Sequence, residues 1–384
     1  MSIITLAVSG YRSLRSLILP LENLTVVTGA NGTGKSSLYR NLRLLAEVSQ
    51  GRCIASLAAE GGLRSTMWAG KSNYSSTMRR GVSPIQGNVG DSPVSLRLGF
   101  ASDDYGYAID LGLPIPDRTM FGHDPVIKAE AVWVGEYLSR RNTIASRAGS
   151  SVMVQGEDGR LRTTISDMAP FESMMMRAAD PTNAMELLLL RDRMRAWRFY
   201  DHFRIDQDAP ARHPRIGTRT IALSSDGSDL AAAIQTIREI GDGPAFDRAI
   251  EDAFPGSQIL VDIRDGFFSI AMQQQGLSRP LTASELSDGT LRYVLLAAAL
   301  HTPRPPSLMI LNEPESSLHP SLLEPLAQMI ANASRASQVI IVSHASSLTE
   351  SLTKQGATSL GLQKEEGETI VPDIEIPPWK WPQR

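Results

Sequence analysis

The chain has 384 residues but only one cysteine, Cys53. A single cysteine excludes an intramolecular disulfide and a cysteine-based zinc site, and it fits a reducing compartment. The chain also lacks a large excess of positive or negative charge, because its formal net charge is −3. No overall field therefore draws the molecule to nucleic acid or to an anionic membrane, and any such partner needs a local patch.

Long apolar runs are missing as well. No stretch reaches the ~18–20 uninterrupted apolar residues that a membrane helix requires, and the run 294–300 fits a buried helix. The N-terminus lacks the basic segment, apolar segment and cleavage site of a signal peptide. We therefore predict a cytoplasmic protein without a membrane partner. The sequence also has no heptad tract and no internal repeat.

The first 48 residues show the pattern of a phosphate-binding loop. Residues 3–8, 14–19 and 24–28 have the composition of short strands, and residues 36–48 place apolar side chains at helical spacing. A strand, a glycine loop and a helix follow one another there, which is the context that such a loop needs.

The loop itself matches GxxxxGK[ST] at every position. The glycines allow backbone N–H groups to curl around a phosphate, and the following helix directs its positive end at the same anion. Lys35 is expected to contact the β- and γ-phosphates of ATP, and the Ser36 hydroxyl to ligate Mg²⁺. The predicted nucleotide-binding residues are Gly29, Ala30, Asn31, Gly32, Thr33, Gly34, Lys35, Ser36 and Ser37.

Residues 308–313 form an apolar strand that ends in Asn312 and Glu313, as in a Walker B motif. Glu313 is the predicted general base that polarises the attacking water. Asn312 stands where an aspartate usually holds Mg²⁺ through a water. A neutral amide can accept a hydrogen bond from that water but supplies no charge, so we expect weaker metal affinity.

Residues 286–290, LSDGT, resemble the ABC signature sequence, with Asp288 in place of its third-position glycine. A helix is predicted to follow from Thr290. The Ser287 hydroxyl, the Gly289 amide and the start of that helix would form an anion site that is incomplete alone. We expect the γ-phosphate bound by a second subunit to complete it.

Two further motifs follow in the order expected of one ATPase head. Residues 315–320, ESSLHP, resemble a D-loop, which lies along a dimer interface. His344 follows the apolar strand 339–342 and is placed to reach the γ-phosphate. The five motifs in order carry more weight than any one of them.

The remaining chain is less informative. Residues 51–92 are rich in Gly, Ser and Arg, and we interpret them as a loop-rich insertion. Further strands are predicted at 94–100, 105–111 and 129–134, helices at 180–197 and 227–240, and a hairpin at 259–272 that turns at Asp265 and Gly266.

The segments GYRSLRSLILPLENLTVVTGANGTGKSSL, WRFYDHFR, ELSDGTLRYVLLAAAL and LNEPESSLHPSLLEPLA resemble stand-alone bacterial AAA-family ATPases of the ABC/SMC/RecF-like class. This resemblance implies an α/β fold, the ABC/SMC-type P-loop ATPase head, with a mixed-sheet lobe and a helical lobe. It also implies that Asn312 is compatible with activity and that Arg12 approaches the nucleotide. A glutamine-loop residue is not identified, and Gln86 and Gln155 are weak candidates.

We expect a single head, 1–384, made of two lobes. Residues 1–135 and 301–384 would form the nucleotide-binding lobe, and 136–300 a mostly helical lobe that ends in the signature motif. No long coiled coil and no appended nuclease domain are predicted.

Residues 191–219 hold eight arginines and four aspartates with interleaved aromatic residues. Such a segment could bind DNA through phosphate contacts and base stacking. The alternative, slightly favoured, is an ordinary helix and strand whose arginines pair with Asp192, Asp201, Asp206 and Asp208.

Three functions are compatible with the motifs. The leading hypothesis is an ATP-dependent homodimer that couples hydrolysis to DNA repair or to defence against foreign DNA. A second is a slow nucleotide switch that regulates a partner protein. A third, the motor subunit of a membrane transporter, is disfavoured by the N-terminal segment and by the insertion at 51–92.

Overall fold

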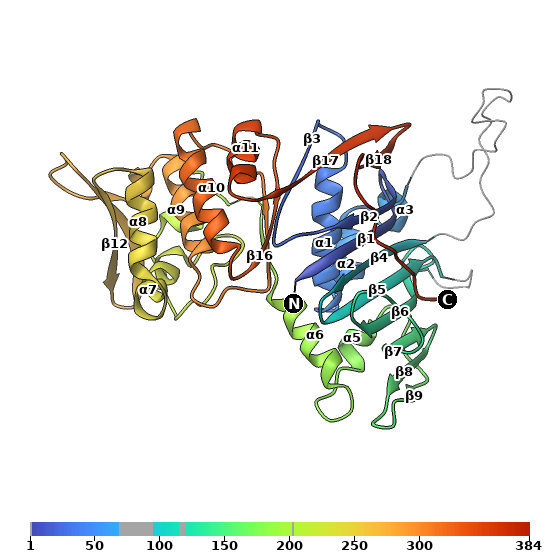
Figure 1. Ribbon diagram of the computed structural model, residues 1–384. Helices are drawn as coiled ribbons and strands as arrows, with labels where there is room; N and C mark the ends of the chain where they lie inside the picture. Colours follow the sequence, from blue (N-terminus) through green and yellow to red (C-terminus); the bar gives the residue numbers. More distant parts are fainter. Residues whose placement is uncertain (1, 69–94, 115–119, 202) are drawn as a thin grey trace.

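The computed structural model describes residues 2–68, 95–114, 120–201 and 203–384. A six-stranded sheet in the order β10-β15-β16-β3-β17-β18 divides the molecule (Figure 1). The first five of these strands run parallel, and β18 returns antiparallel to β17. Their bounds are Arg198–Tyr200 for β10, Leu308–Asn312 for β15, Gln338–Val342 for β16, Leu24–Gly29 for β3, Thr358–Glu365 for β17 and Glu368–Ile370 for β18.

The central strands β15, β16 and β3 are buried on both faces, as the uninterrupted apolar strands 308–311 and 339–342 predict. Strand β17 is exposed along one face. Successive side chains of a strand point to opposite faces. Accordingly, Val27 and Ile340 belong to one hydrophobic core, whereas Val26 and Ile341 belong to the other.

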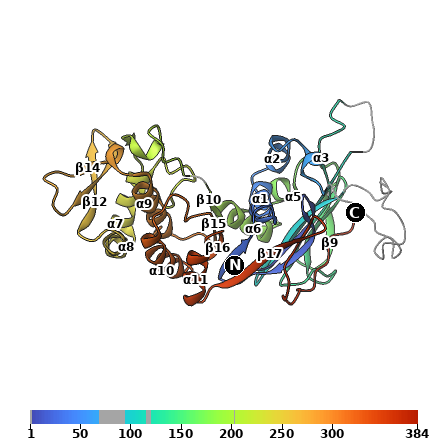
Figure 2. The same ribbon diagram turned by 90° about the horizontal axis from the view of Figure 1, so that it is seen from above.

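The first core is enclosed by helices and an antiparallel sheet of order β2-β1-β4-β5-β6-β7-β8-β9. Helix α1 lies between the two sheets (Figure 2). The strands are β1 Ile3–Tyr11, β2 Leu14–Pro20, β4 Leu96–Ser102, β5 Tyr105–Gly112, β6 Val126–Val134, β7 Thr143–Ala148, β8 Ser151–Gln155 and β9 Leu161–Ile165, and the helices are α1 Lys35–Val48, α2 Cys53–Ala59, α3 Leu63–Thr66, α5 Met174–Arg177 and α6 Met185–Ala196.

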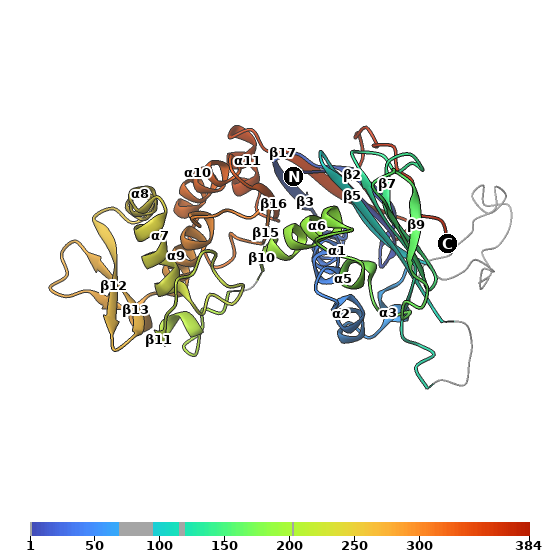
Figure 3. The same cartoon turned by 90° about the horizontal axis from the view of Figure 1, so that it is seen from below.

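The second core lies on the opposite face of the six-stranded sheet, under helices α7 to α11 (Figure 3). These helices are α7 Leu230–Ile240, α8 Gly243–Ala253, α9 Asp288–Leu300, α10 Leu323–Ala333 and α11 Ser346–Lys354. A small sheet of β11 Arg215–Ile216, β12 Ser257–Arg264, β13 Phe267–Gln274 and β14 Leu281–Thr282 packs beside them.

Several predicted boundaries are wrong. Residues 136–300 are not mostly helical, because β7, β8 and β9 extend the antiparallel sheet and β10 joins the six-stranded one. The described part of the 51–92 insertion contains α2 and α3, and residues 69–92 lie outside the described residues. Helix α6 begins at Met185 rather than at Asp180, whose carboxylate instead accepts backbone N–H groups in a preceding turn.

Candidate functional site

The glycine loop connects β3 to α1 and depends on glycine at three positions. Gly29, Gly32 and Gly34 have φ angles of 147°, 80° and 107°, in the region that favours glycine. A Cβ on Gly29 would lie 2.6 Å from the carbonyl oxygen of Leu362, and one on Gly34 would collide with the Thr369 side chain. A Cβ on Gly32 would meet no atom within 4 Å, so the loop is open on that side.

Helix α1 begins without a side-chain cap. Its N-cap residue, Gly34, adopts a left-handed conformation and has no side chain that could accept a hydrogen bond. The first-turn N–H groups therefore remain available to an external acceptor, which favours an anion. Ser36 is exposed in this first turn, whereas Ser37 is buried beneath it.

The Lys35 side chain lies inside the loop. Its Nζ donates hydrogen bonds to the carbonyl oxygens of Gly29 at 2.6 Å and Ala30 at 3.1 Å. Thr33 Oγ1 also donates to the Ala30 carbonyl, at 2.9 Å. The one cation of the motif is thus held at the centre of the curled backbone, where the sequence predicts phosphate binding.

The last hairpin of the chain supports the loop from outside, a contact that sequence reasoning missed. Thr369 of β18 donates through Oγ1 to the Thr33 carbonyl, 2.7 Å away, and contacts Ser13 Oγ at 2.8 Å. The Thr369 N–H also donates to the Ser13 carbonyl. Residues that lie more than 300 positions apart in the chain therefore shape the phosphate loop.

Arg12 lies beside Ser13 in the turn between β1 and β2, with a φ of 45°. Its guanidinium pairs with Glu60 at 2.8 Å, and Arg40 of α1 reaches the same carboxylate at 3.2 Å. The side chain is thus tied to α1 through Glu60. Its approach to a nucleotide stays a prediction.

Glu313 follows directly after β15 in a left-handed backbone conformation, with φ 48°. This conformation is strained for a residue with a side chain. Two hydrogen bonds hold it: the Glu313 N–H donates to Val342 O at 2.7 Å, and the Arg292 guanidinium donates to Glu313 O at 2.8 Å. The carboxylate is left partly exposed, as a base that must meet a water requires.

The structure brings His344 to Glu313, while the predicted approach of His344 to the γ-phosphate stays a prediction. His344 Nδ1 lies 3.6 Å from Glu313 Oε1 and 3.5 Å from Glu315 Oε1. Glu315 is 5% exposed at its side chain and accepts hydrogen bonds from Ser343 Oγ, the His344 N–H and the Ala345 N–H. Glu315 therefore positions the loop that carries His344.

Replacing Glu315 with alanine should destabilise the protein. The substitution leaves the buried Ser343 hydroxyl and the His344 N–H without their acceptor, which costs about 2 kcal/mol or more, while the Ala345 N–H keeps its bond to Ser343 Oγ. Urea unfolding measures the loss, and the exposed Glu350 of α11, changed to alanine, is the matched control. Equal midpoints for the two variants would show that Glu315 does not hold the loop.

Asn312 Nδ2 donates a hydrogen bond to Asp201 Oδ1 at 2.6 Å. The prediction that Asp201 pairs with a nearby arginine is therefore wrong. The Ser36 hydroxyl, the Asn312 amide oxygen and the Asp201 carboxylate are hard oxygen donors, the type that Mg²⁺ prefers. The described ranges contain no group of three His, Cys, Asp or Glu residues suited to a metal, so the donor set fits Mg²⁺ bound mainly through waters and phosphates.

The signature segment forms the start of α9. Ser287 is the N-cap residue, and its Oγ accepts from the Thr290 N–H at 3.1 Å. A Cβ on Gly289 would lie 2.8 Å from the carbonyl oxygen of Ser317, in the predicted D-loop. Only glycine at position 289 therefore allows the signature segment to pack against the predicted D-loop.

Arg212 holds the signature segment from beneath. This buried side chain donates to Ala283 O at 2.8 Å, to Leu286 O at 2.7 Å and to the Asp288 carboxylate at 2.7 Å. Between residues 287–290 and residues 29–37, the described part of the chain shows no hydrogen bond or ion pair. Within one chain, the described residues of the signature segment and the phosphate loop are therefore not bonded to each other.

Residues 191–219 do not present aromatic rings for base stacking. Trp197, Tyr200 and Phe203 are buried, and Phe199 packs edge-on against Tyr39. Several of the arginines have partners within the chain: Arg193 pairs with Asp104, Arg195 bonds to Ser49 O, Arg204 pairs with Asp206 and Arg219 with Glu239. The side chains of Arg204 and Arg219 remain exposed. The prediction of a base-stacking surface in this segment is therefore wrong, whereas its contact with phosphates stays a prediction.

Neither glutamine candidate is supported. Gln155 ends β8 in the antiparallel sheet and donates to Gly159 O within its own hairpin, away from the six-stranded sheet. Gln86 lies outside the described residues.

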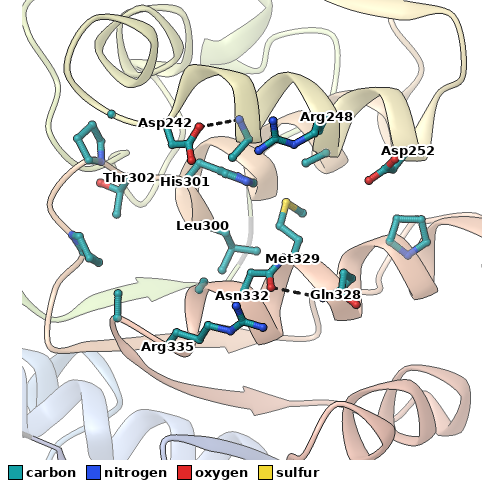
Figure 4. A pocket seen from close by; sticks show the side chains of 18 of the residues that line it. Asp242, Arg248, Asp252, Leu300, His301, Thr302, Gln328, Met329, Asn332 and Arg335 are labelled. Carbon is teal, nitrogen blue, oxygen red and sulfur yellow. Dashed lines mark hydrogen bonds between the residues drawn. The ribbon is translucent and has the colours of Figure 1, made fainter.

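A hollow of 660 Å³ lies between α8, the end of α9 and α10. Figure 4 shows Arg248 and Arg335 on opposite sides of it, with Asp242 and His301 on the side of Arg248. Burial lowers the pKa of His301, which favours its neutral form. None of the predicted site residues lines this hollow.

The phosphate loop on a central parallel strand, with Glu313 and His344 at the ends of neighbouring strands, defines a P-loop ATPase head of the AAA/ABC type. Residues 24–350 match the family described as "AAA domain, putative AbiEii toxin, Type IV TA system", and the chain belongs to this family. No curated protein matches it. Among the described residues, no helix is both long and apolar enough to span a membrane.

Two solved structures share the fold over nearly the whole chain. An Smc head bound to the C-winged helix domain of ScpA is 15% identical, with a TM-score of 0.53 and 97% of each chain covered. The SMC head domain from Thermotoga maritima is 14% identical, with a TM-score of 0.50, 98% of this chain and 100% of that chain covered. The predicted SMC-type head fold is confirmed.

Proposed function

We propose that this ATPase head binds Mg²⁺·ATP at residues 29–37 and hydrolyses it in a homodimer that encloses ATP between two copies of the chain. The support for hydrolysis is the convergence of Glu313 and His344 at the carboxyl edge of the sheet that carries the phosphate loop. Bound Mg²⁺ would neutralise phosphate charge, and Glu313 would take the proton of the attacking water.

The support for a shared site is that two anion-binding features occur in one chain without a bond between them. The start of α9 offers the exposed Ser287 and the Gly289 backbone, but no bond joins it to the phosphate loop within the described chain. An anion site that is incomplete on each copy is completed when a second copy apposes the two features. The close approach of Ser317, in the predicted D-loop, to Gly289 adds support, because a D-loop lies along a dimer interface.

Glu313→Gln should trap the dimer. The amide keeps the size of the side chain but removes the general base, so ATP binding persists while hydrolysis, which would separate the subunits, stops. Light scattering with Mg·ATP should then give a mass near twice 41.7 kDa. The exposed Glu157, changed to glutamine, is the control and should give no such accumulation.

A Glu313→Gln variant that binds ATP but stays monomeric would contradict the dimer proposal and leave the nucleotide site intact. Coupling of hydrolysis to DNA repair or defence rests on the family resemblance alone, because the stacking surface at 191–219 is absent. A change in ATP turnover on adding DNA would support it. A turnover that DNA leaves unchanged, with a bound partner protein, would favour the slow regulatory switch.

A further inference from the structure

Asp201 and Asn312 leave the six-stranded sheet side by side. Strand β10 is the parallel neighbour of β15, and Tyr200 is paired in register with Leu311. The next residues, Asp201 and Asn312, therefore emerge together at the carboxyl edge. Ligands of open parallel sheets bind at this edge, and the phosphate loop follows β3 at the same edge.

The hydrogen bond between these two residues orients both of them. An ionised carboxylate only accepts, so the Asn312 group that faces Asp201 must be the NH₂ group. The Asn312 carbonyl oxygen is consequently directed away from Asp201. Among the described residues, no donor contacts that oxygen or the second carboxylate oxygen of Asp201. One neutral and one anionic acceptor are thus left at the sheet edge.

Asp201 also lies close to the first turns of α1. It lines a hollow together with Tyr39 and Arg40, and Tyr39 is three residues after Ser36 and hence on the same side of the helix. Burial raises the pKa of Tyr39, and the Asp201 charge adds to that rise. Asp201 is thus bonded to Asn312 and lies beside α1, the helix that follows the phosphate loop.

The same carboxylate belongs to the acidic cluster at the predicted catalytic base. Arg292 is buried, and its burial lowers its pKa, whereas the charges of Glu315, Asp201 and Glu313 act in the opposite direction. Three carboxylates that follow two different strands are therefore near enough to act on the charge of one guanidinium.

We propose that Asp201 is the anionic residue of the Mg²⁺·ATP site and supplies the negative charge that Asn312 lacks. This inference rests on the proposed ATP-binding function. Asp201 and Asn312 would together accept hydrogen bonds from the water shell of the metal, while the Ser36 hydroxyl serves as a direct ligand. The usual charge of a Walker B carboxylate is in this way provided from the neighbouring strand.

The test separates a charge at the metal from a merely structural partner of Asn312. Asp201→Asn keeps the shape and an acceptor oxygen for Asn312 but removes the charge. Mn²⁺ binding is measured by electron paramagnetic resonance on the full chain with a non-hydrolysable ATP analogue. We expect Mn²⁺ affinity to fall by about 10-fold or more, while affinity for the analogue in EDTA stays within about twofold, because only the metal senses the lost charge.

Two further variants sharpen the result. Asp206 lies five residues along, exposed and paired with Arg204, so Asp206→Asn should leave Mn²⁺ affinity unchanged. The double variant Asp201→Asn with Asn312→Asp moves the charge from one strand to the next and should restore most of the affinity. Asp201→Ser provides a second neutral variant if Asp201→Asn does not fold.

Mn²⁺ affinity of folded Asp201→Asn within twofold of the wild type would overturn the inference and leave the ATP site standing. A wild-type chain that binds no ATP analogue at all would refute the proposed function, and the inference would fall with it. An equal loss of analogue affinity in EDTA would show that Asp201 acts on the fold of the site rather than on the metal.

Discussion

ATP turnover should fall by about 100-fold or more when Lys35 is replaced by alanine. The Lys35 ammonium is held at the centre of the phosphate loop by the Gly29 and Ala30 carbonyls. Because the residue is only 7% exposed, its charge acts on a bound phosphate with little screening by water. Alanine removes that charge at the position where negative charge is greatest during phosphoryl transfer.

Phosphate release under saturating Mg·ATP measures this effect. Lys364 of β17 is exposed on the same sheet, so Lys364→Ala controls for loss of a lysine elsewhere. A Lys35→Ala variant with turnover within a factor of two of the wild type would contradict the phosphate-loop assignment. Circular dichroism establishes that the variant is folded, since the two hydrogen bonds of Lys35 inside the loop are also lost.

The local pattern predicts much of this fold, because each motif carries its own secondary structure. The glycine loop requires a strand before it and a helix after it, and β3 and α1 have the predicted bounds to within one residue. The strands 308–311 and 339–342 are apolar throughout, which only a sheet covered on both faces explains. The hairpin at Asp265 and Gly266 is likewise set by a local turn.

The errors concern strand order, which is not a local property. Strand β10 contains only Arg198, Phe199 and Tyr200, too few to show a period, and the surrounding arginines suggest a basic surface. Its place beside β15 depends on packing against both cores. The role of Asp201 follows from that place alone, and so the sequence pattern could not reveal it.

The antiparallel sheet shows the same limit. Strands β7 and β8 continue the sheet from β6 through hairpins, but the buried Arg147 interrupts the alternation of apolar and polar residues that would indicate a strand. This guanidinium is balanced by the buried Glu130, 3.2 Å away. Hydrophobic periodicity does not reveal a charged pair within a core. The sequence pattern therefore did not identify the strands in 136–165 and assigned these residues to a helical lobe.

Mixing two inactive variants should restore activity if each site is shared between two copies. A Lys35→Ala subunit lacks the phosphate-loop cation but keeps the start of α9. A Ser287→Arg subunit keeps the phosphate loop but presents a bulky cation at the exposed N-cap of α9. Each homodimer has two defective sites. In a mixed dimer, one site combines both defects, and the other combines two intact halves.

With free exchange of subunits, half of the dimers are mixed and half of their sites are intact, so activity should recover to about a quarter of the wild type. The recovery is smaller if both sites must act together. The matched control mixes Lys35→Ala with Glu313→Gln. Both residues belong to the same half of the site, so every site in that mixture carries a defect, and no recovery is expected.

A site contained within one chain behaves differently, because each mixture then gives only the average of its two separate activities. That average in the first mixture, with subunit exchange demonstrated, would exclude the shared site.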